Sequence, residues 1–150
     1  MRLLVLGGSA FVGHAVVDAA LARGWSVTAL NRGRGGAPPA GVEHLTGDRM
    51  RSGGVDVLRG HRFDAVVDTW QGSARAVREA VRLLAGAVGH YGYVSSVSVY
   101  ASPPPRPLGE TADLEPPPKH GRPTYQASKA EPTARSRRSS ASVPCWRVRA

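Results

Sequence analysis

The stretch LLVLGGSAFVG, at residues 3–13, sets the beginning of the fold. Its four leading apolar residues predict a short strand that is buried on both faces. Glycines follow at once, and a helical pattern then runs from Phe11 to Arg23. Gly7 allows a tight turn, small residues at 8–10 let backbone amides approach phosphate oxygens, and Gly13 lets the helix pack close to the strand. The stretch therefore predicts a strand–turn–helix unit that binds a pyrophosphate, with an ordinary glycine-rich turn as the alternative.

Strand and helix patterns alternate through the first hundred residues. Further strands are predicted at 25–31, 42–46, 63–68 and 91–96, an amphipathic helix at 73–88, and a short helical turn at 55–59. The expected buried faces are Val12, Val16, Ala19 and Ala20 on the first helix, and Val77, Val81, Leu84 and Val88 on the second. This alternation indicates an α/β fold of the three-layer Rossmann type, with a doubly wound parallel sheet of order 3-2-1-4-5 that is incomplete on its C-terminal side.

Composition narrows the class of protein. A chain of 150 residues with 41% hydrophobic residues can form one domain with a core. A single cysteine, Cys145, excludes a disulfide framework and a zinc site built from several cysteines. The five histidines lack metal-ligand spacing and are expected on the surface or in loops, so no metal is expected. No apolar run approaches the roughly 18 residues of a membrane span, and no signal-peptide pattern is present. We therefore expect a cytoplasmic protein without a membrane partner.

The composition changes after residue 100. Residues 101–123 hold eight of the twelve prolines and predict a loop, whereas 124–130 predict a helical turn or two. Residues 131–150 are rich in Ser and Arg, and they contain five arginines but a single acidic residue, Glu131. Without this stretch the net charge falls from +9 to +5, so much of the basic character belongs to the tail. The predicted domain therefore covers residues 1–130, with an irregular tail at 131–150.

The end of the second predicted strand bears on the choice of cofactor. Asn31 stands where an acidic side chain would bind the ribose hydroxyls of NAD, and Arg32 and Arg34 follow it. Basic side chains at this position accommodate the extra phosphate of NADP, so the sequence favours NADP, with NAD as the alternative. Asp48 follows the third predicted strand, where its carboxylate could accept a hydrogen bond from adenine or simply stabilise a turn.

Tyr125 and Lys129 are spaced so that they share one face of a helix. An ammonium close to a phenol favours the phenolate, which makes tyrosine a usable general acid or base. The serines that follow the fifth predicted strand supply hydroxyls that can hold a substrate oxygen. A surface pair is the alternative interpretation of the Tyr–Lys spacing.

Taken in order, these segments resemble the extended, atypical short-chain dehydrogenase/reductase superfamily and its NAD-dependent epimerase/dehydratase family. The matching pieces are LVLGGSAFVG, NRG, TGD, FDAVVDTW, YVSSVSVY and YQASK, which cover about residues 1–130. The resemblance implies Ser96 as the triad serine, Tyr125 as the acid/base, and Lys129 as the residue that binds the nicotinamide ribose and tunes Tyr125. It also implies hydride transfer between the nicotinamide and a hydroxyl or keto group of a small substrate, such as a nucleotide-sugar. The residues expected to bind the cofactor are Gly7, Gly8, Ser9, Ala10, Phe11, Val12, Gly13, Asn31, Arg32, Arg34 and Asp48.

Two features depart from the family pattern. Ala10 stands at the position of the middle glycine, and Pro132 is expected to break the Tyr–Lys helix only three residues after Lys129. The family continues with further strands and a substrate domain, so we expect a truncated chain that is inactive or only marginally stable. The tail resembles an out-of-frame reading of a GC-rich gene; a coding sequence whose other frames lack a Rossmann-like continuation would contradict this interpretation.

A rival interpretation is a Rossmann scaffold that binds RNA or a nucleotide without catalysis, with the arginine-rich tail contacting phosphates. Hydride transfer that depends on Tyr125 would distinguish the enzyme from this binding protein. The fifth strand is expected at an edge of the sheet, and an exposed edge also favours association into a homo-oligomer.

Overall fold

The structure is a computed structural model that describes residues 1–34, 39–101, 112–114, 116 and 129–130. The elements follow the predicted alternation: β1 (Arg2–Leu6), α1 (Phe11–Leu21), β2 (Ser26–Asn31), β3 (Val42–Thr46), the 3-10 turn η1 (Asp56–Leu58), β4 (Phe63–Asp68), α2 (Ala74–Leu83), β5 (Val88–Tyr93) and the 3-10 turn η2 (Val97–Val99). The predicted tail at 131–150 lies outside the described residues, as does most of the predicted proline-rich loop.

All five described strands are parallel and lie in the order β3-β2-β1-β4-β5. β1 is central, with Val5 opposite Ala29 of β2 and Val67 of β4. This order confirms the predicted Rossmann topology. The order reverses at β1, and in open α/β sheets the carboxyl ends of the strands beside such a reversal form a binding crevice.

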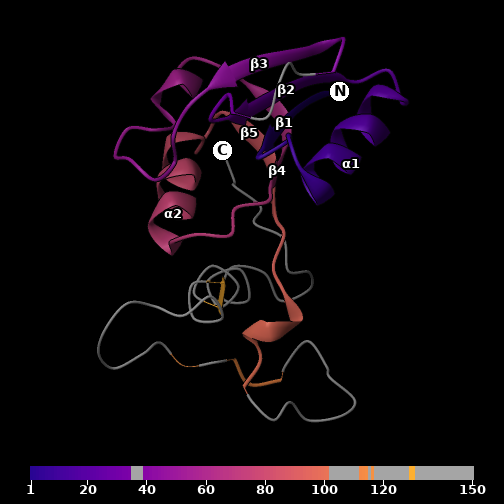
Figure 1. Ribbon diagram of the computed structural model, residues 1–150. Coiled ribbons are helices and arrows are strands. Elements are labelled where there is room, and N and C mark those ends of the chain that lie inside the picture. The colour runs from indigo at the N-terminus through magenta and orange to yellow at the C-terminus, as the bar shows by residue number, and fades with distance from the viewer. Residues whose placement is uncertain (35–38, 102–111, 115, 117–128, 131–150) are drawn as a thin grey trace.

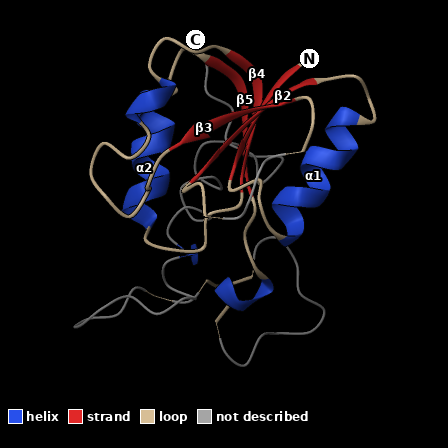
Figure 2. Cartoon of the chain, turned by 45° about the horizontal axis from the view of Figure 1, so that its top comes forward, coloured by secondary structure: helices blue, strands red, loops and turns tan. Residues whose placement is uncertain are grey.

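The helices cover opposite faces of the sheet, which gives three layers (Figures 1 and 2). Because successive strand side chains alternate, Leu3 and Val5 of β1 pack with Val17 of α1, whereas Leu4 and Leu6 pack on the side of α2. Both sets are almost fully buried. The apolar run of β1 therefore serves two cores at once, as expected for a central parallel strand.

The buried face of α1 differs from the prediction. Gly13, Val17 and Ala20 are buried, whereas Val12 is 42% exposed and Ala19 is also exposed. The helix is apolar on most sides, so its sequence pattern does not clearly predict which face is buried. The close approach of Gly13 to the strand turn fixes the rotation instead.

The boundary between α2 and β5 also differs from the prediction. The helix ends at Leu83, and Val88 begins β5 instead of continuing the helix. Gly86 adopts a φ of +75°, which ends the helical path, and Val88 pairs with Phe63 of β4. The strand therefore begins and ends three residues earlier than expected, and Ser96 lies beyond its end. In the described part of the chain, no helix is long and apolar enough to cross a membrane.

Candidate functional site at the carboxyl edge of the sheet

The turn between β1 and α1 has room only for glycine at two positions. Gly7 adopts a φ of +106°, and its N–H donates to the carbonyl of Leu30 at 2.9 Å. A Cβ on Gly13 would lie 2.4 Å from the carbonyl oxygen of Gly7. Ala10, by contrast, has a φ of −149°, an extended conformation that alanine adopts readily. The departure from the family glycine pattern at this position therefore causes no backbone strain.

The N-terminus of α1 presents polar backbone groups without a side-chain partner. Ala10 is the N-cap and makes no side-chain capping hydrogen bond, and the first turn contains no acidic residue. The early N–H groups of a helix need an acceptor and carry a partial positive charge. The end of α1 is therefore suited to an anion, and a pyrophosphate fits this requirement.

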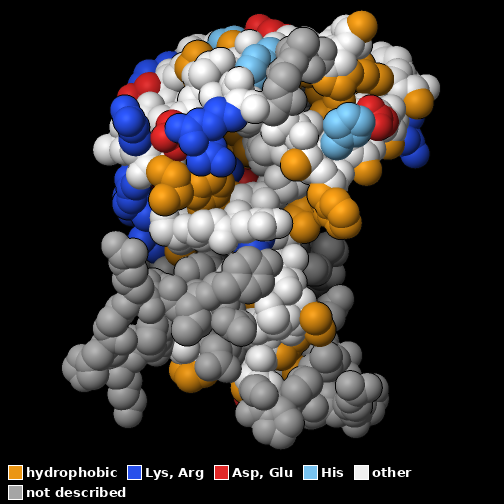
Figure 3. Space-filling view, viewed as in Figure 1, with side chains coloured by type: hydrophobic (Ala, Val, Ile, Leu, Met, Phe, Trp, Pro, Cys, Tyr) orange, Lys and Arg blue, Asp and Glu red, His pale blue; other side chains and the backbone are white. Residues whose placement is uncertain are grey.

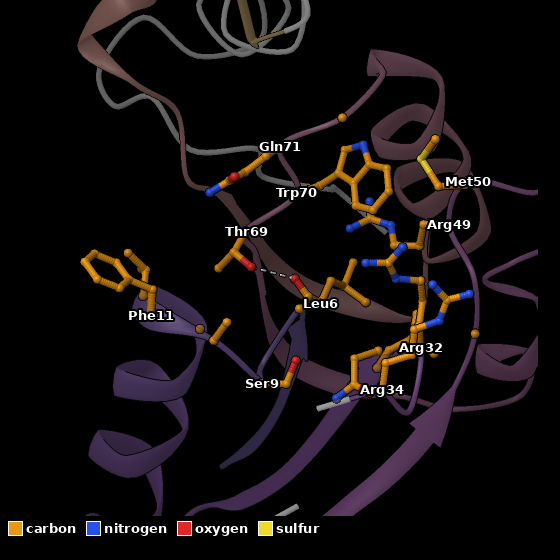
Figure 4. A pocket seen from close by; sticks show the side chains of 18 residues that line it. Leu6, Ser9, Phe11, Arg32, Arg34, Arg49, Met50, Thr69, Trp70 and Gln71 are labelled. Carbon is orange, nitrogen blue, oxygen red and sulfur yellow. Dashed lines mark hydrogen bonds between the residues drawn. The ribbon is translucent and has the colours of Figure 1, made fainter. Parts of the chain in front are cut away.

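A cleft of about 470 Å³ lies in front of this turn. Its lining residues lie at or after the carboxyl ends of β1, β2, β3 and β4 or in the first turn of α1: Leu6, Gly7, Ser9, Ala10, Phe11, Val12, Gly13, Leu30, Asn31, Arg32, Arg34, Gly47, Arg49, Met50, Thr69, Trp70, Gln71 and Gly72. Arg32, Arg34 and Arg49 lie on one side and Phe11 on the other (Figure 4). Phe11 is 93% exposed at a φ of +45°. On the face shown in Figure 3, basic side chains gather beside exposed hydrophobic ones.

Two of the predicted cofactor residues lie outside this lining. Gly8 is buried, and a Cβ there would meet Val17 and Ala29 at 3.1 and 3.2 Å. Asp48 turns its carboxylate onto its own loop, where Oδ1 accepts from the N–H of Met50 at 3.0 Å. Both residues therefore shape the backbone around the cleft, and the turn interpretation of Asp48 describes its observed contacts.

The side chain of Asn31 is held by two neighbours. Its Oδ1 accepts from the N–H of Gly33 at 2.8 Å and lies 2.7 Å from Nε2 of His44. His44 was expected on the surface or in a loop; it is a half-buried residue of β3. The sequence carries no periodic signal for this contact, because it forms between neighbouring strands.

A buried ionic cluster, which sequence reasoning missed, lies behind the cleft. Arg49 donates to both carboxylate oxygens of Asp68, at 2.6 and 2.8 Å, and also to the carbonyl of Ala76. Asp68 is fully buried and also accepts from the Tyr91 hydroxyl at 2.5 Å and from the Trp70 N–H at 2.9 Å. Acidic residues that end a buried strand, as Asp68 does, are the one sequence signal for such a cluster.

The charges in this cluster shift two pKa values upward. Burial lowers the pKa of the Arg49 guanidinium, but the charge and hydrogen bonds of Asp68 outweigh burial and raise it. Burial, assisted by the charge of Asp68, holds the pKa of the Tyr91 phenol well above its ordinary value. Arg49 therefore stays charged and Tyr91 stays neutral, and the cluster fixes the strand ends that carry the cleft.

Trp70 connects the cluster to the cleft wall. The guanidinium of Arg49 lies 5.0 Å from the centre of the Trp70 ring, a cation–π distance, and the indole N–H donates to the carbonyl of Ser73. Gly72 has no room for a side chain, because a Cβ would lie 2.6 Å from the indole. The ring is therefore held in place beside the cleft that it lines (Figure 4).

The structure describes two of the three predicted catalytic residues. Ser96 is half-buried after β5, and its hydroxyl accepts from the N–H of Ser98 at 3.2 Å. Lys129 is buried, and its ammonium donates to the carbonyls of Trp70 and Val94 at 2.6 and 2.8 Å. Burial lowers the pKa of this ammonium from its ordinary value. Tyr125 lies outside the described residues. Within the described part, no group of three His, Cys, Asp or Glu residues could hold a metal ion.

The sheet order and the glycine turn define a Rossmann-type α/β domain. The chain belongs to the NAD dependent epimerase/dehydratase family, which its sequence matches over residues 3–81. Comparison of the sequence with curated proteins found no match.

Several solved structures share the fold of this chain. The chain is similar to a UDP-galactose 4-epimerase, with a TM-score of 0.75, 19% identity, and coverage of 91% of this chain and 50% of that one. It is also similar to the enzyme WbmG of Bordetella bronchiseptica in complex with NAD and UDP, with a TM-score of 0.69, 18% identity, and coverage of 87% of this chain and 47% of that one. A third similar structure is TunA, an NAD dependent NDP-hexosamine 5,6-dehydratase involved in tunicamycin biosynthesis. Its TM-score is 0.66 and its identity 24%, and the match covers 86% of this chain and 46% of that one. The chain thus spans about half the length of these proteins, and at this identity the likeness shows the fold.

Proposed function

We propose that the cleft binds NADP, with NAD as the weaker alternative. The observation that supports this proposal best is the glycine turn, which leaves no room for a Cβ at Gly13 and brings the uncapped N-terminus of α1 to a cleft that Arg32 and Arg34 also line. The backbone amides suit a pyrophosphate, and the two arginines suit a phosphate on the adenosine ribose. No acidic side chain is among the lining residues.

We further propose that residues 1–130 are the cofactor-binding part of an NAD(P)-dependent epimerase, dehydratase or reductase. The small-molecule substrate would carry a hydroxyl or keto group, and a nucleotide-sugar is the class suggested by relatives that are a UDP-galactose 4-epimerase and an NDP-hexosamine dehydratase.

When bound, the nicotinamide supplies a hydride acceptor and donor. On the protein side, Tyr125 would exchange a proton with the substrate oxygen, and the Ser96 hydroxyl would hold that oxygen. The Lys129 ammonium would favour the Tyr125 phenolate, because a nearby positive charge stabilises the ionised phenol. The carbonyls of Trp70 and Val94 already hold this ammonium at the carboxyl ends of β4 and β5, which supports its assignment to the site.

Titration with NADPH and NADH, followed by nucleotide fluorescence and calorimetry, tests the binding proposal. We expect tighter binding of NADPH, and we expect Arg32→Ala combined with Arg34→Ala to weaken NADPH binding roughly ten- to a hundredfold while NADH changes little. Arg59→Ala is the matched control, since Arg59 is exposed, pairs with Asp56 and lies outside this cleft. Tighter binding of NADH would contradict the NADP preference.

The catalytic assignment needs a separate experiment. Tyr125→Phe should abolish hydride transfer to a keto substrate or from a hydroxyl substrate, while the dissociation constant for NADPH stays within about threefold of the original, since the phenol acts on the substrate. Unchanged turnover in this variant would overturn the role of Tyr125. Tight, salt-dependent RNA binding in a chain that binds no dinucleotide would favour the binding-protein alternative.

A further inference from the structure

The contacts of the Asn31 carboxamide show which of its two terminal atoms is the oxygen and which is the nitrogen. The N–H of Gly33 lies 2.8 Å from the side-chain atom Oδ1 of Asn31. A backbone N–H can only donate, so the atom that faces it must be the oxygen. His44 approaches the same oxygen with Nε2 at 2.7 Å, so this ring nitrogen must carry the proton and donate.

The register of the sheet brings His44 to this place. In the parallel pair of β2 and β3, Asn31 stands opposite Thr46 and Ala29 stands opposite His44. Side chains two residues apart on a strand share a face, so Asn31 and His44 project from the same side of neighbouring strands. Both residues are half-buried, which excludes much of the water that would otherwise compete for the hydrogen bond.

These contacts determine which group Asn31 offers to the cleft that it lines. The carbonyl oxygen has two lone pairs, and Gly33 and His44 use both. The side-chain NH₂ is left as the group available to a ligand, and it can only donate. Phosphate oxygens only accept, so this donor suits a phosphate on the ribose. A carboxylate at the same place would accept from a ribose hydroxyl and repel a phosphate.

We propose that His44 is a positioning residue for cofactor discrimination: it holds the Asn31 carboxamide with its NH₂ group toward the cleft and so favours a dinucleotide with a 2′-phosphate. This inference rests on the proposed dinucleotide function. His44 itself does not contact the ligand. Its effect is exerted through Asn31, beside the positive charges of Arg32 and Arg34.

Three variants test the proposal by the ratio of the dissociation constants for NADH and NADPH, measured by calorimetry. His44→Leu removes the donor and should lower the preference for NADPH roughly two- to tenfold, the equivalent of one hydrogen bond. His44→Gln can still donate to Oδ1 and should restore most of the preference. Asn31→Asp keeps an oxygen for Gly33 and His44 but replaces the outward NH₂ with an acceptor, so it should reverse the preference in favour of NADH.

Measurements without cofactor provide an independent readout. The ¹⁵N shifts of the His44 ring should show the proton on Nε2, and the side-chain NH₂ resonance of Asn31 should shift in His44→Leu but return toward its original position in His44→Gln. His61→Leu is the matched control, because His61 is also half-buried but stacks on Phe63, and neither residue lines the cleft. This control should change neither the Asn31 resonance nor the ratio.

The outcomes separate the two proposals. If both dinucleotides bind and His44→Leu leaves the ratio unchanged, or if the proton lies on Nδ1, the role of His44 is wrong while the dinucleotide function stands. Tighter binding of NADH than of NADPH by the unaltered protein would also overturn the proposed role of His44. If neither dinucleotide binds, the proposed function fails and this inference fails with it. Should His44→Leu not fold, Asn31→Asp and the ring shifts still decide the question.

Discussion

At the scale of single residues, Asp68 is the most heavily bonded side chain described near the cleft. It accepts from Arg49 twice, from the Tyr91 hydroxyl and from the Trp70 N–H, and its own side chain is fully buried. A buried ion pair of this kind adds little net stability compared with apolar packing, but it becomes costly once a single partner is removed. The cluster therefore makes the geometry of the cleft wall sensitive to single substitutions.

The first prediction concerns this buried charge. Asp68→Asn should destabilise the protein by about 3 to 5 kcal/mol, because it leaves the Arg49 guanidinium buried without its counter-ion. Urea denaturation measures the change. Asp56→Asn removes half of an exposed ion pair with Arg59 and should cost less than about 1 kcal/mol. Equal losses for the two variants would show that Asp68 is not buried as described.

The second prediction concerns Tyr91 and alkaline pH. Because the folded protein holds the pKa of this phenol well above its ordinary value, folding retains a proton that the unfolded chain releases above about pH 10. The stability due to Tyr91 is therefore fully present below pH 10 and is lost as the pH rises, by at most about 1.4 kcal/mol per pH unit. Denaturation between pH 8 and 11.5 should show this extra slope in the unaltered protein and not in Tyr91→Phe. Identical slopes in the two proteins would contradict a raised pKa of the Tyr91 phenol in the folded state.

At the scale of elements, the β1–turn–α1 unit requires a residue without a side chain at Gly13 and presents the positive end of the α1 dipole to the cleft. Gly13 allows the helix to approach the carbonyl of Gly7, and this approach rotates the helix so that Val12 faces outward. The same approach brings the uncapped end of α1 to the cleft. Packing and phosphate binding therefore depend on one missing side chain.

The third prediction tests this unit. In Gly13→Ala, the new methyl would lie 2.4 Å from the Gly7 oxygen, so the backbone must move. We expect a loss of about 1 to 3 kcal/mol in stability, in line with other overpacked sites, and at least a tenfold loss of dinucleotide affinity. The neighbouring His14→Ala changes an exposed helix position and should affect neither quantity. Full affinity in Gly13→Ala would contradict the assigned role of the turn.

At the scale of the whole molecule, two α-helices cover the described sheet, one on each face (Figure 2). β3 and β5 are its edge strands within the described residues, and edge strands offer unpaired backbone groups to other chains. Phe11, Met50 and Val97 are large hydrophobic residues that are 93%, 61% and 69% exposed. We propose that this surface makes the isolated chain prone to self-association.

The fourth prediction follows from this exposure. Thermal melting followed by circular dichroism should show a broad transition at the low end of the range of ordinary domains, near or below about 45 °C, and light scattering should rise with protein concentration. Added NADPH should raise the midpoint, because a ligand that binds only the folded state stabilises it. A sharp transition at high temperature in a monomer would contradict the prediction.

The sequence by itself determined the order of the elements, the glycine turn and the topology of the sheet. The order of the elements and the glycine turn depend on local periodicity and on the size of one side chain, and the sheet topology follows from right-handed crossovers between alternating strands and helices. The sequence also predicted a catalytic site at Ser96, Tyr125 and Lys129, which stays a prediction, and it placed the end of the fifth strand three residues too late.

Only the tertiary structure decided which partners meet. Asp68 binds Arg49 and Tyr91, which lie 19 and 23 residues away, and His44 reaches Asn31 across 13 residues. No periodicity records such contacts, because they depend on the register between neighbouring strands and on which side chains meet across them. The rotation of α1 and the end of α2 were settled in the same way, by packing against the sheet rather than by the helical pattern alone.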